Sequence, residues 1–126
     1  MNRSAKVCIV CGREIQWRKK WQNNWHQIKY CSRACRKAGL TKIDIDLEKA
    51  ILRLLRSRKT GASICPSEAV RELVHFDDQS QWQSLMEPAR RAARRLVHLG
   101  KIQIMQGASV VNPSKFKGPI RLRLKH

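Results

Sequence analysis

Acidic residues are scarce in this sequence. Its 126 residues contain 9 Asp and Glu against 27 Lys and Arg, which gives a formal net charge of +18. This excess favours a polyanionic partner, nucleic acid first and an anionic membrane surface second. Paired carboxylates, a nucleophile–base set and an open metal site are also missing from the sequence. We therefore expect a protein that is not an enzyme, and no small-molecule substrate is evident.

Long apolar runs are absent as well. No stretch approaches the roughly 18 consecutive apolar residues of a membrane span. The opening MNRSAKVCIVCG lacks the apolar segment of a signal peptide. We expect a cytoplasmic protein with no membrane partner. Because thiols stay reduced in that compartment, the five cysteines favour metal binding over disulfides.

Proline is missing from the first 42 residues, and the composition changes at that point. Residues 1–42 carry 11 Lys and Arg, one acid, four of the five cysteines and three of the four tryptophans. Residues 43–126 carry 16 Lys and Arg, 8 acids and all four prolines. We expect two domains with these boundaries, 1–42 and 43–126.

Four cysteines form two pairs with the spacing of zinc ligands. Two residues separate Cys8 from Cys11, three separate Cys31 from Cys35, and 19 residues lie between the pairs. A short spacer lets one tight turn aim both sulfurs at the same ion. We expect one structural Zn²⁺ in a closed, non-catalytic site with four thiolates. His26, which lies between the pairs, is the alternative to one of the cysteines.

The order of residues around the cysteines predicts a treble-clef-like finger. The first pair forms a knuckle. Residues 15–21 and 25–30 are expected to form a hairpin with its turn at 22–24, since Asn tolerates the backbone of tight turns. The second pair is expected in the first turn of a helix, where positions i and i+4 share a face.

Three tryptophans lie in the stretch WRKKWQNNW, interleaved with three basic residues. Trp17, Trp21 and Trp25 are four apart, a spacing that does not distinguish a strand from a helix. A unit of about 40 residues has few large side chains for a core. We expect at least two of the rings to pack over the metal site. The alternative, compatible with the first, is that a half-exposed ring stacks on nucleic-acid bases.

The second region begins with helical periodicity. Residues 44–58 predict a helix with acids in its first turn and arginines toward its end, which suits the helix dipole. A short extended piece at 62–64 precedes a second helix that Pro66 opens. A third helix is expected from Ser80 or Ser84 to Leu99, with Gly100 as its C-terminal stop.

After that glycine the apolar period becomes two. Residues 101–106, 109–111 and 120–124 read as strands, with a basic loop at 115–118 between the last two. Helix, strand, helix, helix and hairpin is the order of a winged helix. The whole chain is therefore predicted to be α+β, a zinc-binding treble-clef-like finger followed by a winged-helix domain.

The third helix is amphipathic, and its expected outer face is almost entirely arginine. Arg90, Arg91, Arg94 and Arg95 lie opposite an arc of apolar residues. Because the third helix of a winged helix enters the major groove, we expect these four residues to contact nucleic acid. The alternatives are a solvated face and a protein-binding module.

Two parts of the sequence resemble known families. CIVCGREIQWRKKW with KYCSRACR, over about residues 6–37, resembles a small bacterial family of uncharacterised four-cysteine proteins. That resemblance implies the same four cysteines as zinc ligands and makes the tryptophans part of the motif. ICPSEAVREL with LMEPARRAARRLVHLGKI and GPIRLRL, over about residues 44–125, resembles a second bacterial family of unknown function with a winged-helix fold. Together they imply a fusion of two folds and no particular activity.

The sequence as a whole favours a zinc-containing nucleic-acid-binding protein, with DNA favoured over RNA. The alternative is an adaptor whose finger and winged helix bind an acidic or nucleic-acid-associated protein. Further phosphate contacts are expected from basic residues of the finger and of the wing: Arg18, Lys19, Lys20, Lys115, Lys117, Arg121 and Arg123.

Overall fold

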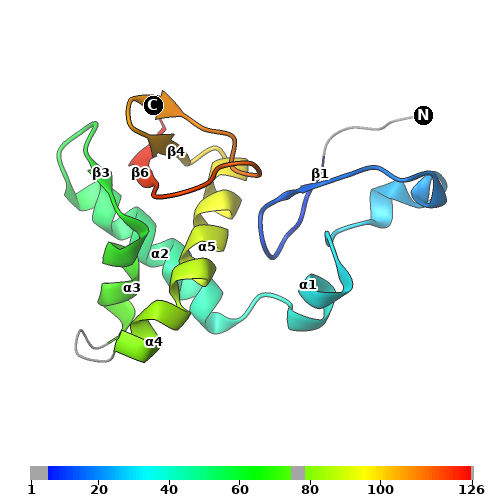
Figure 1. Cartoon of the computed structure of the whole chain (residues 1–126), viewed down its shortest axis with the longest axis horizontal. Helices are drawn as coiled ribbons and strands as arrows, with labels where there is room; N and C mark the ends of the chain where they lie inside the picture. The colour runs from blue at the N-terminus through cyan, green and yellow to red at the C-terminus, as the bar shows by residue number, and fades with distance from the viewer. Residues whose placement is uncertain (1–5, 75–78, 126) are drawn as a thin grey trace.

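The computed structural model describes residues 6–74 and 79–125 and has two units that pack against each other (Figure 1). We call residues 6–40 the N-terminal unit and the described residues from 41 onward the C-terminal unit. The fold is α+β, with helices and two small antiparallel sheets. None of the described helices is both long enough and apolar enough to cross a membrane.

The N-terminal unit has short elements joined by tight turns. In chain order they are strands β1 (Lys6–Val7) and β2 (Glu14–Ile15), 3-10 helices η1 (Lys19–Trp21) and η2 (Trp25–Gln27), and helix α1 (Arg33–Ala38). The two strands pair antiparallel and close the loop that carries the first cysteine pair. The sulfurs of the second pair come from α1 and from the residue before its cap.

The predicted hairpin over residues 15–21 and 25–30 is wrong. In this segment successive amides donate to carbonyls three residues back, as from Trp21 N to Arg18 O at 2.9 Å and from Ile28 N to Trp25 O at 3.1 Å. These bonds use the donors that a hairpin ladder would need. The resulting 3-10 turns bring the rings of Trp21 and Trp25 into a stack, with centroids 6.1 Å apart.

The core of the N-terminal unit consists of the cysteines and a few large side chains. Trp25 is buried, and Trp17 and Trp21 pack against the same cluster from its edge. The expectation that at least two rings pack over the cysteines is therefore confirmed. The buried members are Cys8, Val10, Cys11, Ile15, Trp25 and Cys35.

The C-terminal unit places helices against one face of a four-stranded sheet. The helices are α2 (Lys42–Ser57), α3 (Pro66–Leu73), α4 (Gln79–Ser84) and α5 (Met86–His98). The strands are β3 (Ser63–Ile64), β4 (Ile102–Gln106), β5 (Ser109–Val110) and β6 (Arg121–Leu124). Their order in the sheet is β3-β6-β4-β5, and all neighbours are antiparallel.

Local sequence explains where these helices start. Thr41 caps α2 through a capping box with Asp44, and Cys65 with Glu68 does the same before Pro66 at the first position of α3. The third predicted helix is divided at Leu85 into α4 and α5. Pro88 has no amide hydrogen to continue a helix from α4, so it lies in the first turn of a new one.

Helices α2, α3 and α5 enclose the main core with the sheet. Fully buried side chains from each layer meet there, including Ile51 of α2, Val70 of α3, Leu96 of α5, Ile104 of β4 and Leu122 of β6. This packing fixes the rotation of α5 about its axis. It also decides which of the arginines on α5 turn toward the N-terminal unit.

Candidate metal centre and the basic surfaces around it

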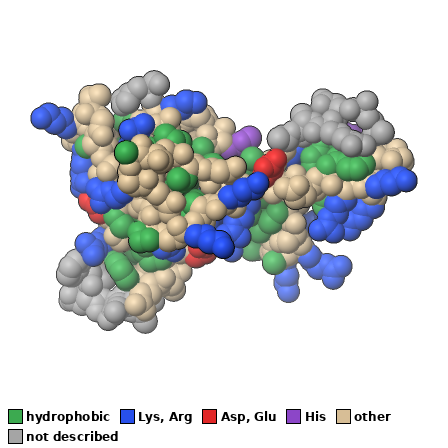
Figure 2. Space-filling view, turned by 45° about the horizontal axis from the view of Figure 1, so that its top comes forward, with side chains coloured by type: hydrophobic (Ala, Val, Ile, Leu, Met, Phe, Trp, Pro, Cys, Tyr) green, Lys and Arg blue, Asp and Glu red, His purple; other side chains and the backbone are tan. Residues whose placement is uncertain are grey.

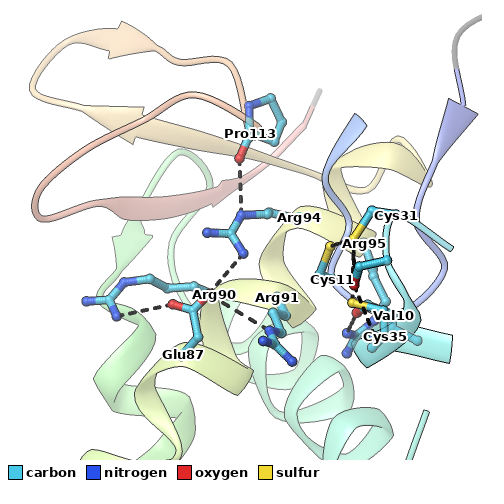
Figure 3. Close-up of polar contacts among 11 residues, drawn as sticks. Val10, Cys11, Cys31, Cys35, Glu87, Arg90, Arg91, Arg94, Arg95 and Pro113 are labelled. Atoms are coloured by element: carbon cyan, nitrogen blue, oxygen red, sulfur yellow. Dashed lines mark hydrogen bonds and ion pairs between the residues drawn. The ribbon is translucent and has the colours of Figure 1, made fainter. Parts of the chain in front are cut away.

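Four cysteine sulfurs converge in the N-terminal unit. The Sγ atoms of Cys8, Cys11, Cys31 and Cys35 all lie within 4.8 Å of one another. Cys31 Sγ lies 3.5 Å from Cys11 Sγ and 3.6 Å from Cys35 Sγ (Figure 3). Sulfurs placed tetrahedrally at about 2.3 Å from an ion would be separated by about 3.8 Å. The residues therefore fit a single tetrahedrally coordinated metal ion.

The backbone around each cysteine pair holds the sulfurs in place. In the knuckle, Gly12 N donates to Cys8 O at 3.0 Å, and Cys8 N donates to Arg13 O at 2.8 Å. In the second pair, the Ser32 hydroxyl accepts from Cys35 N at 3.2 Å and caps α1. The predicted position in the first turn of a helix is thus confirmed for Cys35, whereas Cys31 lies outside the helix, one residue before its cap.

The pKa values of two of these thiols are shifted in opposite directions by their surroundings. Burial raises the pKa of Cys8, but backbone amides of Cys11, Cys31 and Val10 outweigh it and bring the value down to about 7. The pKa of Cys31 is raised to about 12 by burial and by the thiols of Cys11 and Cys35. Crowded sulfurs resist losing all their protons until a cation neutralises the charge.

His26 does not join this cluster. Its side chain is exposed on η2, and the only residues of the described chain whose ligand atoms gather in this way are the four cysteines. The alternative in which His26 replaces a cysteine is therefore not supported. Cys65 is also separate, since its thiol contacts the Ser67 hydroxyl at 3.1 Å at the start of α3.

A hollow beside the metal centre combines cations with aromatic rings. It has a volume of about 300 Å³. Arg18 and Lys20 lie over the ring of Trp21 at 5.7 and 5.3 Å from its centroid. We call this the basic-aromatic hollow; its walls are Arg18, Lys20, Trp21, Tyr30, Cys31, Ser32, Arg33 and Arg36.

The cations of the N-terminal unit lack acidic partners. Glu14 is the single acid between residues 6 and 40, and none of the salt bridges in the described chain involves a cation of this unit. Arg18, Lys19 and Lys20 are all exposed. Figure 2 shows the blue Lys and Arg side chains around this end of the molecule, on its right.

The arginines of α5 do not form the outer face that the sequence predicts. Arg94 and Arg95 are only 3% and 6% exposed. The prediction is wrong for these two residues because the N-terminal unit covers this side of α5. Periodicity within one helix shows which side chains share a face, but it does not show what covers that face.

Arg95 links three segments of the chain. Its Nε donates to a Glu48 carboxylate oxygen of α2 at 2.6 Å, and its Nη2 donates to Asp44 O at 3.1 Å. Its Nη1 donates to the carbonyl oxygen of Val10, inside the cysteine knuckle (Figure 3). A guanidinium group with these three acceptors holds the N-terminal unit against the C-terminal unit.

Arg94 is fixed on the neighbouring side of the helix. Its Nε donates to Pro113 O at 3.1 Å, and its Nη1 donates to Glu87 at 3.3 Å. Burial, and then the nearby positive charge of Arg13, lower the pKa of Arg94 from its ordinary value. Gly12 makes this packing possible, because a Cβ atom there would lie 2.3 Å from the Cβ of Arg94.

Arg90 and Arg91 are half-buried and share one acid. Each has a nitrogen 3.9 Å from a carboxylate oxygen of Glu87. Together with Arg94, three guanidinium groups therefore surround a single carboxylate. Because one carboxylate offsets only one of the three positive charges, a net positive charge remains around Glu87.

The basic residues of the predicted wing have mixed surroundings. Lys115 and Lys117 are exposed. Arg121 donates to the hydroxyl and carbonyl oxygens of Ser63 at 3.0 and 2.9 Å. Arg123 is half-buried and donates to Gln103 at 2.9 Å. Lys115 and Lys117 are thus free to meet a ligand, whereas the two arginines also tie β6 to its neighbours.

An apolar groove lies between the units, and sequence periodicity gave no sign of it. It has a volume of about 250 Å³. Ile9, Leu40, Ile45 and Leu99, four of the five large hydrophobic side chains that are exposed among the described residues, lie on its walls. Leu99, at the end of the third helix predicted from the sequence, is 59% exposed. Only the packing of the two units brings these residues together.

Comparison with known proteins assigns both parts of the chain to families. Residues 1–38 match the family model described as an uncharacterized protein conserved in bacteria (DUF2256). Residues 44–125 match the model described as a protein of unknown function (DUF3253). No curated protein matches the chain. Both matches agree with the resemblances found in the sequence. The second match covers more than half of the chain. The chain therefore belongs to the family described as protein of unknown function (DUF3253).

Proposed function

We propose that this chain is a zinc-containing nucleic-acid-binding protein whose main contact surface is the N-terminal unit. The observation that carries the proposal is the basic-aromatic hollow. Four cations and two aromatic rings share it, and no acidic side chain lies on its walls. Cations that follow a phosphate backbone beside rings on which bases stack are the usual construction of nucleic-acid-binding grooves.

Zinc is the metal that the site favours. Four thiolates in a tetrahedral arrangement are typical of structural zinc, and the zinc supplies the cross-link that a unit of this size needs. Cys8, Cys11, Cys31 and Cys35 would hold it. A knuckle followed by a helix with the second ligand pair supports a treble-clef-like interpretation of the unit.

A winged-helix interpretation of the C-terminal unit rests on its element order. Helix α2, strand β3, three further helices and an antiparallel strand pair follow one another, with α4 and α5 in the place of a single third helix, and β3 pairs with β6. In the proposed complex α5 does not enter a groove of DNA, because Arg94 and Arg95 are buried under the N-terminal unit. Lys115 and Lys117, in the loop before β6, provide a second phosphate contact.

Matched charge-removal variants test this proposal. The zinc-loaded full-length chain is titrated against labelled duplex DNA, single-stranded DNA and RNA over a range of salt. The triple variant Arg18→Gln, Lys20→Gln, Arg36→Gln removes three charges from the hollow. The control Lys49→Gln, Arg53→Gln, Arg56→Gln removes three exposed charges from α2.

We expect the hollow variant to bind at least about tenfold more weakly. Its slope of log K against log salt should fall by about 2 to 3, because each lost phosphate contact contributes about 0.7–0.9. The α2 control should retain most of the affinity and of the slope. Equal losses of affinity in both variants would mean that binding depends on net charge alone, which would contradict the proposal. The affinities measured for duplex DNA, single-stranded DNA and RNA show which of these nucleic acids the chain prefers.

A protein-binding adaptor is the second candidate function, and the apolar groove favours it. A contiguous exposed apolar surface between two units is a common mark of a protein interface. The double variant Ile9→Ser, Leu99→Ser should release a partner that remains bound after nuclease treatment. Val110→Ser is the control, because Val110 is 53% exposed on β5 and lies outside the groove. A partner that both variants retain would exclude the groove as its binding site.

A further inference from the structure

A second cavity, of about 460 Å³, lies where α5 meets the start of α3, the cysteine knuckle and the loop before β6. This volume is within the range of small-molecule sites. It is separate from both the basic-aromatic hollow and the apolar groove, since no wall residue is shared with either. Its charged walls are Arg13, Glu87, Arg90 and Arg94.

The charges on these walls do not balance. Three arginines face one glutamate, a local excess of two positive charges (three minus one). Glu87 cannot offset more, because it also lies 3.9 Å from Arg91 outside the cavity. Positive charges kept close together next to a cavity indicate that an anion completes the site.

Arg94 is the built-in part of this site. It is 97% buried, with Nε and Nη1 bonded to Pro113 and Glu87. Its Nη2 has no hydrogen-bond partner within the described chain, yet no buried polar atom there lacks a partner. Nη2 therefore keeps some contact with solvent, and Arg94 lies on the wall of this cavity. Figure 3 shows the guanidinium groups of Arg90 and Arg94 extending from α5 to the same side.

The other walls are apolar. The guanidinium carbon of Arg94 lies 5.1 Å from the ring centroid of Phe116, so the cation and the ring adjoin inside one site. A ligand that fits must combine an anionic end with a flat or apolar body. The apolar side chains on the walls are Pro66, Met86, Phe116, Pro119 and Ile120.

We propose that this cavity binds a phosphate monoester with a flat ring system, that is, a nucleoside monophosphate. A phosphate monoester carries about −1.5 to −2 charges at pH 7, which matches the excess of two. A carboxylate or a phosphodiester within a strand carries one charge and would leave the site cationic. Arg13, Arg90 and Arg94 hold the phosphate, and the ring lies against Phe116.

The monophosphate has two sources. It is either a free nucleotide or the phosphorylated end of a nucleic-acid strand, and only the second source rests on the function proposed above. Both present the same phosphate and ring to the cavity. Oligonucleotides with and without a 5′-phosphate separate the two sources.

The test is calorimetric titration of the zinc-loaded full-length chain with adenosine 5′-monophosphate, adenosine and inorganic phosphate. We expect the monophosphate to bind at least about tenfold more tightly than either of the other two probes, because only it engages both walls. Arg90→Gln should weaken this binding about tenfold or more, as expected for the loss of a charged hydrogen bond. Phe116→Leu should weaken binding of the monophosphate and leave that of inorganic phosphate unchanged.

Arg91→Gln is the matched control. Arg91 lies on the same helix and at the same 3.9 Å from Glu87, but it is not on the wall of the cavity. Its variant should change the affinity less than about twofold, because a ligand in the cavity would contact Arg90 but not Arg91. If Arg90→Gln lowers the melting temperature more than Arg91→Gln does, Arg13→Gln on the N-terminal unit replaces it in the comparison.

The outcomes separate this inference from the proposed function. No binding of the monophosphate at millimolar concentration, or equal effects of Arg90→Gln and Arg91→Gln, overturns the cavity proposal even if polynucleotides bind. Binding of the monophosphate without binding of any polynucleotide supports the cavity, assigns it to a free nucleotide and contradicts the proposed function. A tenfold preference for the 5′-phosphorylated oligonucleotide supports the strand end as the ligand.

Discussion

The two units are both basic, but they use their positive charge differently. On the N-terminal unit the cations are mainly exposed and have no ion pairs within the described chain. In the C-terminal unit six arginines form ion pairs within the described chain, and one of them, Arg95, links the two units. Net charge therefore does not identify a binding surface. We propose the N-terminal unit as that surface because its exposed cations have a single acid, Glu14, among them.

Metal removal should have the largest effect and should act on one unit only. Metal binding to small sites contributes about 10–16 kcal/mol to folding. A chelator, or the substitution Cys35→Ser, should unfold residues 6–40 and shift tryptophan emission to the red. Helical circular dichroism from α2, α3 and α5 should largely remain, because their core is separate.

Cys65→Ser serves as the control for metal removal. Its thiol lies outside the four-cysteine cluster, so metal content and emission should not change. An emission spectrum that does not respond to the chelator would contradict a folding role for the metal.

Arg95→Met should be the most damaging single change outside the cysteines. It leaves Glu48 and the carbonyls of Val10 and Asp44 without their donor in a buried setting. Removing one partner of a buried pair costs about 3–5 kcal/mol. Denaturant unfolding of Arg95→Met and of the half-exposed Arg91→Met measures the difference. Equal losses would mean that Arg95 does not connect the units.

Gly12→Ala tests the close contact between the knuckle and α5. Gly12 and Gly107 both have a positive φ, of 77° and 61°. Only at Gly12 would a Cβ atom meet other atoms, 2.3 Å from Arg94 Cβ and 2.8 Å from Arg95 N. Gly12→Ala should therefore cost about 2 kcal/mol more than Gly107→Ala, as for an overpacked site. Thermal unfolding of both variants gives this difference, and similar melting temperatures would show that the units can separate without cost.

Arg53→Gln should have the smallest effect. Arg53 lies 3.8 Å from Glu72 of α3, and the two side chains are 57% and 40% exposed. Exposed ion pairs of this kind contribute about 0–1 kcal/mol. The unfolding free energy should change by less than about 0.5 kcal/mol. A loss as large as that of Arg95→Met would remove the distinction between exposed and buried arginines in this unit.

Elements set by local chemistry could be predicted from the sequence. The cysteine spacing identified the possible metal cluster, apolar periodicity with acids in the first turn located α2, and Pro66 located the start of α3. The alternation of apolar residues after Gly100 located β4 and β6. Each of these depends on residues that are close in sequence.

Features set by the contact between units could not be predicted in the same way. The burial of Arg94 and Arg95 depends on Gly12 and Val10, more than 80 residues earlier in the chain. The 3-10 turns replaced a hairpin because Trp21 and Trp25 stack over the cysteine cluster. The basic-aromatic hollow, the apolar groove and the cavity beside Arg94 are likewise each lined by several segments of the chain. Periodicity within one element therefore does not predict them.

The most direct test of the central claim is a map of amide chemical shifts. The zinc-loaded, isotopically labelled chain is titrated with a short oligonucleotide that lacks a terminal phosphate. We expect the largest shifts in residues 18–36 of the N-terminal unit and smaller ones around Lys115 and Lys117, with Arg91, Ala92 and Arg95 of α5 little changed. Largest shifts along α5, with residues 18–36 unchanged, would show that α5 and not the N-terminal unit is the contact surface.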